Sequence, residues 1–192
     1  MLRKFTAILS MVILSAQAGA SGLDLRLANE TAEIMYLTES STFGYGGADI
    51  GLGYLFNEGD DFIISGQAMI TGHSAGNNRS LQFGVGVKLA MISIDRPPVN
   101  EDVGALAVGG QIRYLFPSST PVAILAEGFI APEVVSFSGA DRYWEYRFAV
   151  ELEVTPSARA YIGYRKIGVE LLNIVPEFEI DDQAHIGVKF EF

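Results

Sequence analysis

The sequence contains no cysteine, only two histidines and only one tryptophan among its 192 residues. Without cysteine the protein forms no disulfide, and the lipid anchor of bacterial lipoproteins, which needs a cysteine at the cleavage point, is excluded. Basic residues are also scarce, because 13 Lys and Arg oppose 23 Asp and Glu. Such an acidic chain repels nucleic acid, so no nucleic-acid partner is expected.

Long apolar runs are missing except near the N-terminus. There, Arg3 and Lys4 precede an apolar stretch over residues 5–14, followed by small residues that offer a cleavage site near Ala18 or Ala20. This stretch is shorter than the roughly 20 residues that a membrane-spanning helix needs. We predict a signal peptide over residues 1–20, removed on export, and one domain over residues 21–192. Cleavage removes two basic residues and no acidic ones, so the formal charge changes from −10 to −12.

What the sequence does contain is alternation of apolar and polar residues with a period of two. Between residues 143 and 154, for example, Trp144, Tyr146 and Phe148 alternate with Glu145 and Arg147. A helix would scatter these residues around its circumference, whereas a strand places them on opposite faces. The pattern predicts an all-β protein with ten strands, near residues 22–28, 32–38, 43–56, 62–71, 80–91, 104–116, 122–131, 143–155, 158–169 and 184–192.

The last strand and the aromatic residues favour a membrane barrel over a soluble β-sandwich. The chain ends on Phe192, and the outward set of the last strand is a membrane-insertion pattern typical of outer-membrane barrels. Aromatic residues also fall toward the strand ends on the apolar face, as in an interfacial girdle. We expect an antiparallel transmembrane β-barrel of ten strands, with eight as the alternative and both termini in the periplasm. The membrane-insertion set is Ile186, Val188, Phe190 and Phe192.

Several segments in the second half of the chain are similar to one family. They are residues 127–132 (EGFIAP), 135–137 (VSF), 143–146 (YWEY), 161–165 (YIGYR) and 181–187 (DDQAHIG). In these segments the chain resembles the YfaZ-type family of predicted outer-membrane proteins, most closely over residues 104–192. The resemblance implies an outer-membrane barrel of the Gram-negative envelope, and the family brings no assigned reaction.

The polar face of the strands predicts a charged lumen. Its acids and bases come from consecutive strands, so we expect ion pairs between neighbouring strands. These pairs would fill a narrow barrel, since barrels of about eight strands are just wide enough for their own side chains. The alternative is a constriction that selects small solutes by charge, as in a porin-like channel. The predicted network is Arg113, Glu127, Glu145, Arg147, Glu151, Glu153, Arg159 and Arg165.

Catalysis has little support in the sequence, so we expect a protein that is not an enzyme. His185 opens the last strand beside Asp181 and Asp182, where we expect a rim residue that is hydrogen-bonded to those acids. A lipid-modifying enzyme, the less favoured alternative, would hold a serine or an acid within reach of His185 at the lipid-facing rim.

No cofactor and no metal site is expected. The acidic segments 57–61, 101–102 and 177–182 are predicted to form external loops, where carboxylates could attract hard cations. The expected partners are outer-membrane lipid and lipopolysaccharide and, during insertion, periplasmic chaperones and the barrel-assembly machinery. The sequence leaves the oligomeric state open.

Overall fold

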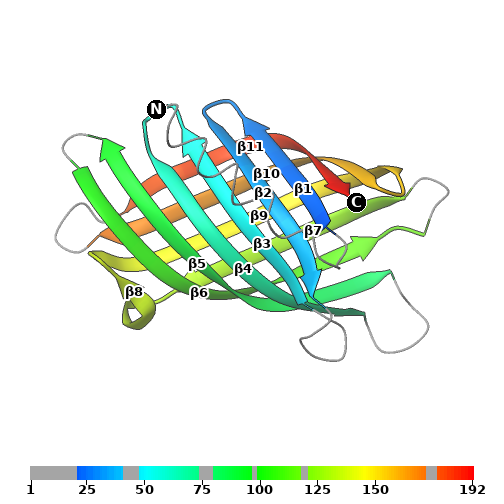
Figure 1. The fold of residues 1–192 in the computed structure, drawn as a ribbon, viewed down its shortest axis with the longest axis horizontal. Helices are drawn as coiled ribbons and strands as arrows, with labels where there is room; N and C mark the ends of the chain where they lie inside the picture. Colours follow the sequence, from blue (N-terminus) through cyan, green and yellow to red (C-terminus); the bar gives the residue numbers. More distant parts are fainter. Residues whose placement is uncertain (1–20, 41–47, 74–79, 97–98, 118–120, 172–176) are drawn as a thin grey trace.

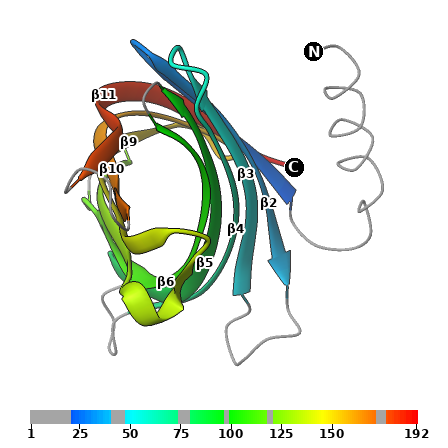
Figure 2. The same cartoon turned by 90° about the vertical axis from the view of Figure 1, so that its left-hand side faces the viewer.

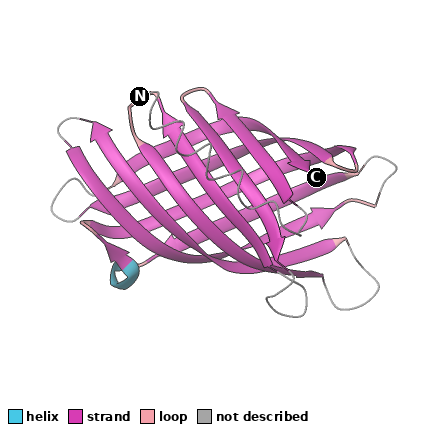
Figure 3. Ribbon diagram, viewed as in Figure 1, coloured by secondary structure: helices cyan, strands magenta, loops and turns pink. Residues whose placement is uncertain are grey.

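The computed structural model describes residues 21–40, 48–73, 80–96, 99–117, 121–171 and 177–192. These residues form strands almost throughout, with one short 3-10 turn at Glu133–Val135 (Figure 3). The predicted signal peptide lies outside the described residues. The strands are β1 (Ser21–Ala28), β2 (Thr31–Ser40), β3 (Ala48–Asn57), β4 (Phe62–His73), β5 (Leu81–Arg96), β6 (Val99–Leu115), β7 (Val122–Ala131), β8 (Ser136–Phe137), β9 (Ala140–Thr155), β10 (Ala158–Leu171) and β11 (Phe178–Glu191).

Ten of these strands close into an antiparallel barrel, which confirms the predicted fold and its strand count over the eight-stranded alternative. Each strand pairs with its neighbours in chain order, and β1 pairs with β11 to complete the ring (Figures 1 and 2). The two-residue strand β8 only extends the edge of β6 and adds no member to the ring. Within the described residues, each of the ten strands therefore has a paired neighbour on both sides, which is the condition for a sheet to cross a bilayer.

The barrel has two unlike ends. We call the end where β1 begins and β11 finishes the terminal end, because Ser21 and Phe192 exchange backbone hydrogen bonds of 2.9 and 2.7 Å there. The opposite end is the far end. It carries the connections after β1, β3, β5, β7 and β10.

In two places the strands continue beyond the ends predicted from the sequence. The predicted strands 80–91 and 104–116 leave residues 92–103 outside the strands, but β5 continues to Arg96 and β6 starts at Val99, so their ladder extends to the far end. Likewise, β11 begins at Phe178, so most of the segment 170–183 belongs to strands. Charged residues interrupt the apolar alternation in both segments, but backbone pairing does not depend on side-chain polarity. The beginning of the predicted strand 43–56 lies outside the described residues up to 47.

The outward face of the barrel is apolar and exposed. Val85 is 67% exposed, Leu52 62% and Ile162 61%, and the predicted C-terminal set Ile186, Phe190 and Phe192 also points outward. Outward aromatic residues gather at both ends, with Tyr114 against Phe116 at the terminal end and Trp144 stacked on Tyr146 toward the far end. A surface of this kind, encircling a closed barrel, matches the apolar band and aromatic girdles of membrane barrels.

No helix in the described part of the chain has the length and apolar character needed to cross a membrane.

Candidate functional site: the interior of the barrel

The interior has three layers between the far end and the terminal end. An apolar cluster occupies the far half, a layer of buried charges lies below it, and a polar cavity lies toward the terminal end. Members of the apolar cluster include Ile94, Val103, Phe129, Tyr143 and Ile167, all at most 3% exposed. Further members, including Leu55 on β3, Ile63 on β4 and Ile180 on β11, come from the opposite side of the ring, so the cluster spans the barrel rather than lining one wall.

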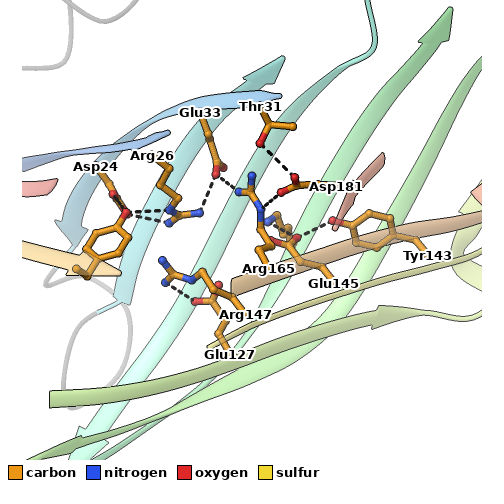
Figure 4. A network of polar contacts seen from close by, with 12 residues as sticks. Asp24, Arg26, Thr31, Glu33, Glu127, Tyr143, Glu145, Arg147, Arg165 and Asp181 are labelled. Atoms are coloured by element: carbon orange, nitrogen blue, oxygen red, sulfur yellow. Dashed lines mark hydrogen bonds and ion pairs between the residues drawn. The ribbon is translucent and has the colours of Figure 1, made fainter. Parts of the chain in front are cut away.

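Arg165 is the centre of the charged layer and is 1% exposed. Its Nε donates to Asp181 Oδ2 at 2.7 Å on the adjacent strand β11, and its Nη1 pairs with Glu33 on β2 (Figure 4). Thr31 adds a hydroxyl hydrogen bond of 3.1 Å to the other oxygen of Asp181. Burial of a guanidinium costs several kcal/mol unless its donors find partners, and two carboxylates supply them here.

A bulge explains why Asp181 points inward. The β10–β11 register shifts between Ile167, which pairs with Asp181, and Gly168, which pairs with Glu179. Ile180 is therefore the extra residue, and both Ile180 and Asp181 are buried at 3% exposure. A bulge of this type breaks the strict alternation of faces. Strict alternation in the sequence would have placed only one of the two inside.

Arg26 joins β1 to this layer. Its guanidinium is 2.8 Å from both Glu33 Oε2 and Asp24 Oδ2, and its Nε donates to the Tyr161 hydroxyl at 3.1 Å. Tyr161 in turn donates to Asp24. Glu33 thus accepts from two arginines, and this shared carboxylate connects the Arg26 and Arg165 clusters into one network (Figure 4).

Lys88 and Glu145 form an ion pair across the barrel. Lys88 Nζ on β5 is 2.5 Å from Glu145 Oε2 on β9, and the Tyr143 hydroxyl donates to the same oxygen at 2.6 Å. The Lys88 ammonium also lies 5.5 Å from the centre of the Phe129 ring, at the boundary with the apolar cluster. The strands β7 and β6 separate β9 from β5 in the ring, so this pair reaches through the lumen.

The predicted lumen residues are distributed over this network and the cavity. Glu145 and Arg165 are in the charged layer, Arg113 pairs with Glu151 at 2.7 Å, and Arg147 lies 3.6 Å from Glu127. Arg159 pairs with Glu191 nearer the terminal end. Glu153 is half-buried, and its side chain forms no ion pair with any described residue.

The expectation that pairs would join neighbouring strands is wrong for several of them. Glu145, Arg113 and Arg165 each reach a partner on a strand that is not adjacent, because long side chains in a narrow barrel meet across the lumen. Sequence reasoning also missed five members of the network. The missed members are Asp24, Arg26, Glu33, Lys88 and Asp181. A signal for Asp24 and Arg26 existed, because they alternate with leucines in β1, as the predicted inward residues alternate with apolar residues in other strands.

The cavity has a volume of about 280 Å³ and lies between the charged layer and the terminal end. Arg147, Glu127 and Tyr161 line its inner part, and Arg159 and Glu191 line its outer part. Across the cavity, Glu39 and Asp49 contribute carboxylates from β2 and β3. The lining is therefore mainly polar and contains both signs of charge.

His185 lies inside the barrel, not at the rim. It is 4% exposed, its ring meets the Tyr161 ring edge to face at 6.0 Å, and it packs against Gly163. Neither ring nitrogen has a hydrogen-bond partner among the described residues, so the expected contacts with Asp181 and Asp182 are wrong. Residue 185 shares the inward face of β11 with Gly187, whereas Asp182 points outward to Tyr164 and Lys166.

The acidic segments do not form one external rim. Asp61 is buried and pairs with Arg96 at 2.6 Å, and Asp181 belongs to the interior network. Glu101 and Asp102 are exposed residues of β6 rather than of a loop. In the described part of the chain, no group of three or more acidic or histidine side chains is arranged to hold a metal ion.

These features define a class of protein: a closed ten-stranded antiparallel barrel that is apolar outside and ionic inside, a combination compatible with an outer-membrane protein. The family model described as "YfaZ precursor" matches residues 2–192, nearly the whole chain, so the protein belongs to the YfaZ family. The family resemblance seen in the sequence is thereby confirmed, and the word "precursor" fits the predicted signal peptide. Searches of curated proteins and of solved structures returned no match.

Proposed function

We propose that this YfaZ-family protein is a small, non-catalytic barrel of the bacterial outer membrane whose lumen does not conduct ions. The observation that carries this proposal is the sorting of side chains between the two faces of the barrel: exposed apolar residues cover the outside, whereas the buried charges point inside and pair with one another. In water, an apolar surface around the whole barrel would far exceed the few hundred Å² that soluble monomers expose. In a bilayer the same surface contacts lipid, and in a closed barrel the strands hydrogen-bond to neighbours on both sides, as a lipid environment requires.

The proposed orientation has both chain ends in the periplasm, as in bacterial barrels with an even strand number. The cavity then faces the periplasm and the apolar cluster faces the outside of the cell. Outer-membrane lipid and lipopolysaccharide would surround the barrel, and periplasmic chaperones with the barrel-assembly machinery would deliver it. The outward Phe190 and Phe192 at the end of the last strand support this route.

Two layers of the interior, the charged layer and the apolar cluster, argue against ion conduction. An ion that crosses the lumen would have to separate the Lys88–Glu145 and Arg165–Asp181 pairs and then pass the apolar cluster. Both steps are unfavourable, because each leaves a charge buried without its partner.

A narrow porin-like channel is the second candidate, and one observation favours it. The polar cavity already extends from the terminal end to the charged layer, so a channel would require only movement in the far half. A lipid-modifying role has weaker support, because His185 is enclosed by the barrel and, among the described residues, has no serine or acid hydrogen-bonded to it.

Planar-bilayer recording tests the proposal directly. The refolded mature protein, shown to be folded by heat-modifiable gel migration, is expected to give no steady conductance. Steady conductance that changes with Glu127→Ala or Arg147→Ala, but not with the exposed control Arg142→Ala, would instead establish a channel.

Membrane fractionation of cells tests the proposed outer-membrane location, and recovery in the inner membrane or the soluble periplasm would contradict it. Mass spectrometry of phospholipid and lipopolysaccharide incubated with the protein tests the non-catalytic role, with no product expected.

A further inference from the structure

We propose that the cavity at the terminal end binds a short zwitterionic peptide, with its carboxylate at Arg147 and its ammonium group at Glu39 and Asp49. This proposal concerns binding only. It does not depend on whether the far half of the barrel conducts.

Among the described Lys and Arg residues of the cavity, Arg147 is the one with a buried side-chain nitrogen that has no hydrogen-bond partner. Its side chain is 8% exposed, its Nε is buried without a partner, and its nearest carboxylate among the described residues is Glu127, 3.6 Å away. That separation is too long for a hydrogen bond. The other basic cavity residues have closer partners, for example Arg113 with Glu151 at 2.7 Å and Lys189 with Glu191 at 3.3 Å. A buried guanidinium left this way favours a carboxylate ligand, which accepts two parallel N–H bonds.

Glu39 and Asp49 present the complementary charge. They are directly opposite each other in the β2–β3 ladder, an arrangement of like charges that is unfavourable without a cation. In the described part of the chain no basic side chain lies within ion-pair distance of either carboxylate; Asp49 receives only a hydrogen bond of 3.4 Å from the Thr71 hydroxyl. An ammonium group placed between them would relieve the repulsion.

The two charged positions lie on opposite walls. In the ring order, β3 and β9 are five strands apart in either direction, so Asp49 and Arg147 face each other across the lumen. The apolar side chains Met35, Met69 and Leu125 line the cavity as well and offer contacts for small side chains. Among the described residues, five Lys or Arg and six Asp or Glu side chains line the cavity. This near balance favours a zwitterion over a simple anion or cation.

Ligand length follows from this separation. The two charges of a single amino acid are carried on one α-carbon and cannot reach opposite walls, whereas an extended chain gains about 3.3–3.6 Å per residue. The cavity volume is close to the lower limit of ligand pockets, about 300 Å³. A peptide of two or three small residues meets both conditions.

The test uses tri-alanine as the probe and isothermal calorimetry on the refolded full barrel in detergent. Free tri-alanine is expected to bind saturably at millimolar concentration. N-acetylation of the peptide and, separately, C-amidation should each weaken binding by about tenfold or more, as expected for loss of a charged hydrogen bond.

Two variants assign the ends. Asp49→Asn, at a half-buried position, is expected to reduce the difference between the free and the acetylated peptide, because only Glu39 then remains for the ammonium group, while the effect of amidation persists. The double variant Arg147→Gln/Glu127→Gln removes both members of the loose pair together, so that neither charge is left buried alone, and should abolish the effect of amidation instead. Glu170→Gln, in an exposed pair outside the cavity, is the matched control and should bind like the parent.

Absence of saturable binding, or binding that is equal for free and capped peptides, would overturn the proposal. Binding that Asp49→Asn leaves unchanged toward both peptides would also overturn it. Each of these outcomes differs from failure of the proposed function, which is judged by conductance and location.

Discussion

The ring of Tyr161 on β10 lies over Gly187, its cross-strand partner on β11, so closely that a Cβ at residue 187 would overlap the ring. The glycine thereby gives the tyrosine room to lie along the barrel wall and to reach Asp24 and Arg26. Aromatic cover of a strand glycine is a known means of shaping barrels. In this protein the covering side chain, Tyr161, also connects the barrel wall to the ionic network, because its hydroxyl group bonds Asp24 and Arg26.

Gly187→Ala is accordingly expected to destabilise the barrel by about 1–3 kcal/mol, the usual cost of overpacking. Urea unfolding of the refolded protein, followed by fluorescence of the single tryptophan Trp144, measures the change. Gly66→Ala is the matched control, because the nearest atom to its new methyl group would be Leu52 Cδ2 at 3.6 Å. A similar loss in both variants would mean that the Tyr161 contact has no special role.

Arg165→Met should be the most damaging single change in the interior. It leaves Glu33 and Asp181 buried without the guanidinium that both contact, which predicts a loss of about 3–5 kcal/mol in the same unfolding experiment. The control Arg142→Met breaks a pair in which the arginine is 53% exposed, and it should cost less than about 1 kcal/mol. Equal effects of the two variants would contradict the structural role of the network.

The Lys88–Glu145 pair should be replaceable as a unit. Lys88→Met alone leaves Glu145 buried with only the Tyr143 hydroxyl, so a clear loss of stability is expected. In the double variant Lys88→Met/Glu145→Met much of that loss should be recovered, because the site borders the apolar cluster and no charge is left buried. The urea midpoints of unfolding of the single and double variants test this prediction. A double variant that is less stable than Lys88→Met alone would contradict it.

Val108→Arg tests the lipid-facing surface. Val108 is 55% exposed near the middle of β6, and an arginine at the bilayer midplane of a barrel costs about 2–4 kcal/mol. Val154→Arg, near the end of β9, should cost only about 0–1 kcal/mol. Unfolding from lipid vesicles should show this difference, and both substitutions should be tolerated alike in detergent micelles with charged headgroups. Equal tolerance in vesicles would mean that β6 does not face lipid.

Much of the architecture follows from local pattern. Alternation in β9 assigns Trp144 and Glu145 to opposite faces because side chains in a strand alternate at every residue, whatever the rest of the chain does. The same rule applies to β5, β6 and the C-terminal strand, and strand number then follows from counting such segments. The ends of the strands were less predictable, since the β5–β6 ladder continues past the last apolar pair into charged residues.

The class of fold, the outward apolar face and most of the inward charges can be derived from the amino-acid sequence, because they depend on the two-residue period of a strand. Which of these charges pair depends on the folded barrel. Barrel closure brought Arg165 to Glu33 and Lys88 to Glu145, and a bulge turned Asp181 inward. The cavity and the under-used guanidinium of Arg147 likewise arise from the meeting of non-adjacent strands, a distance in space that no local pattern encodes.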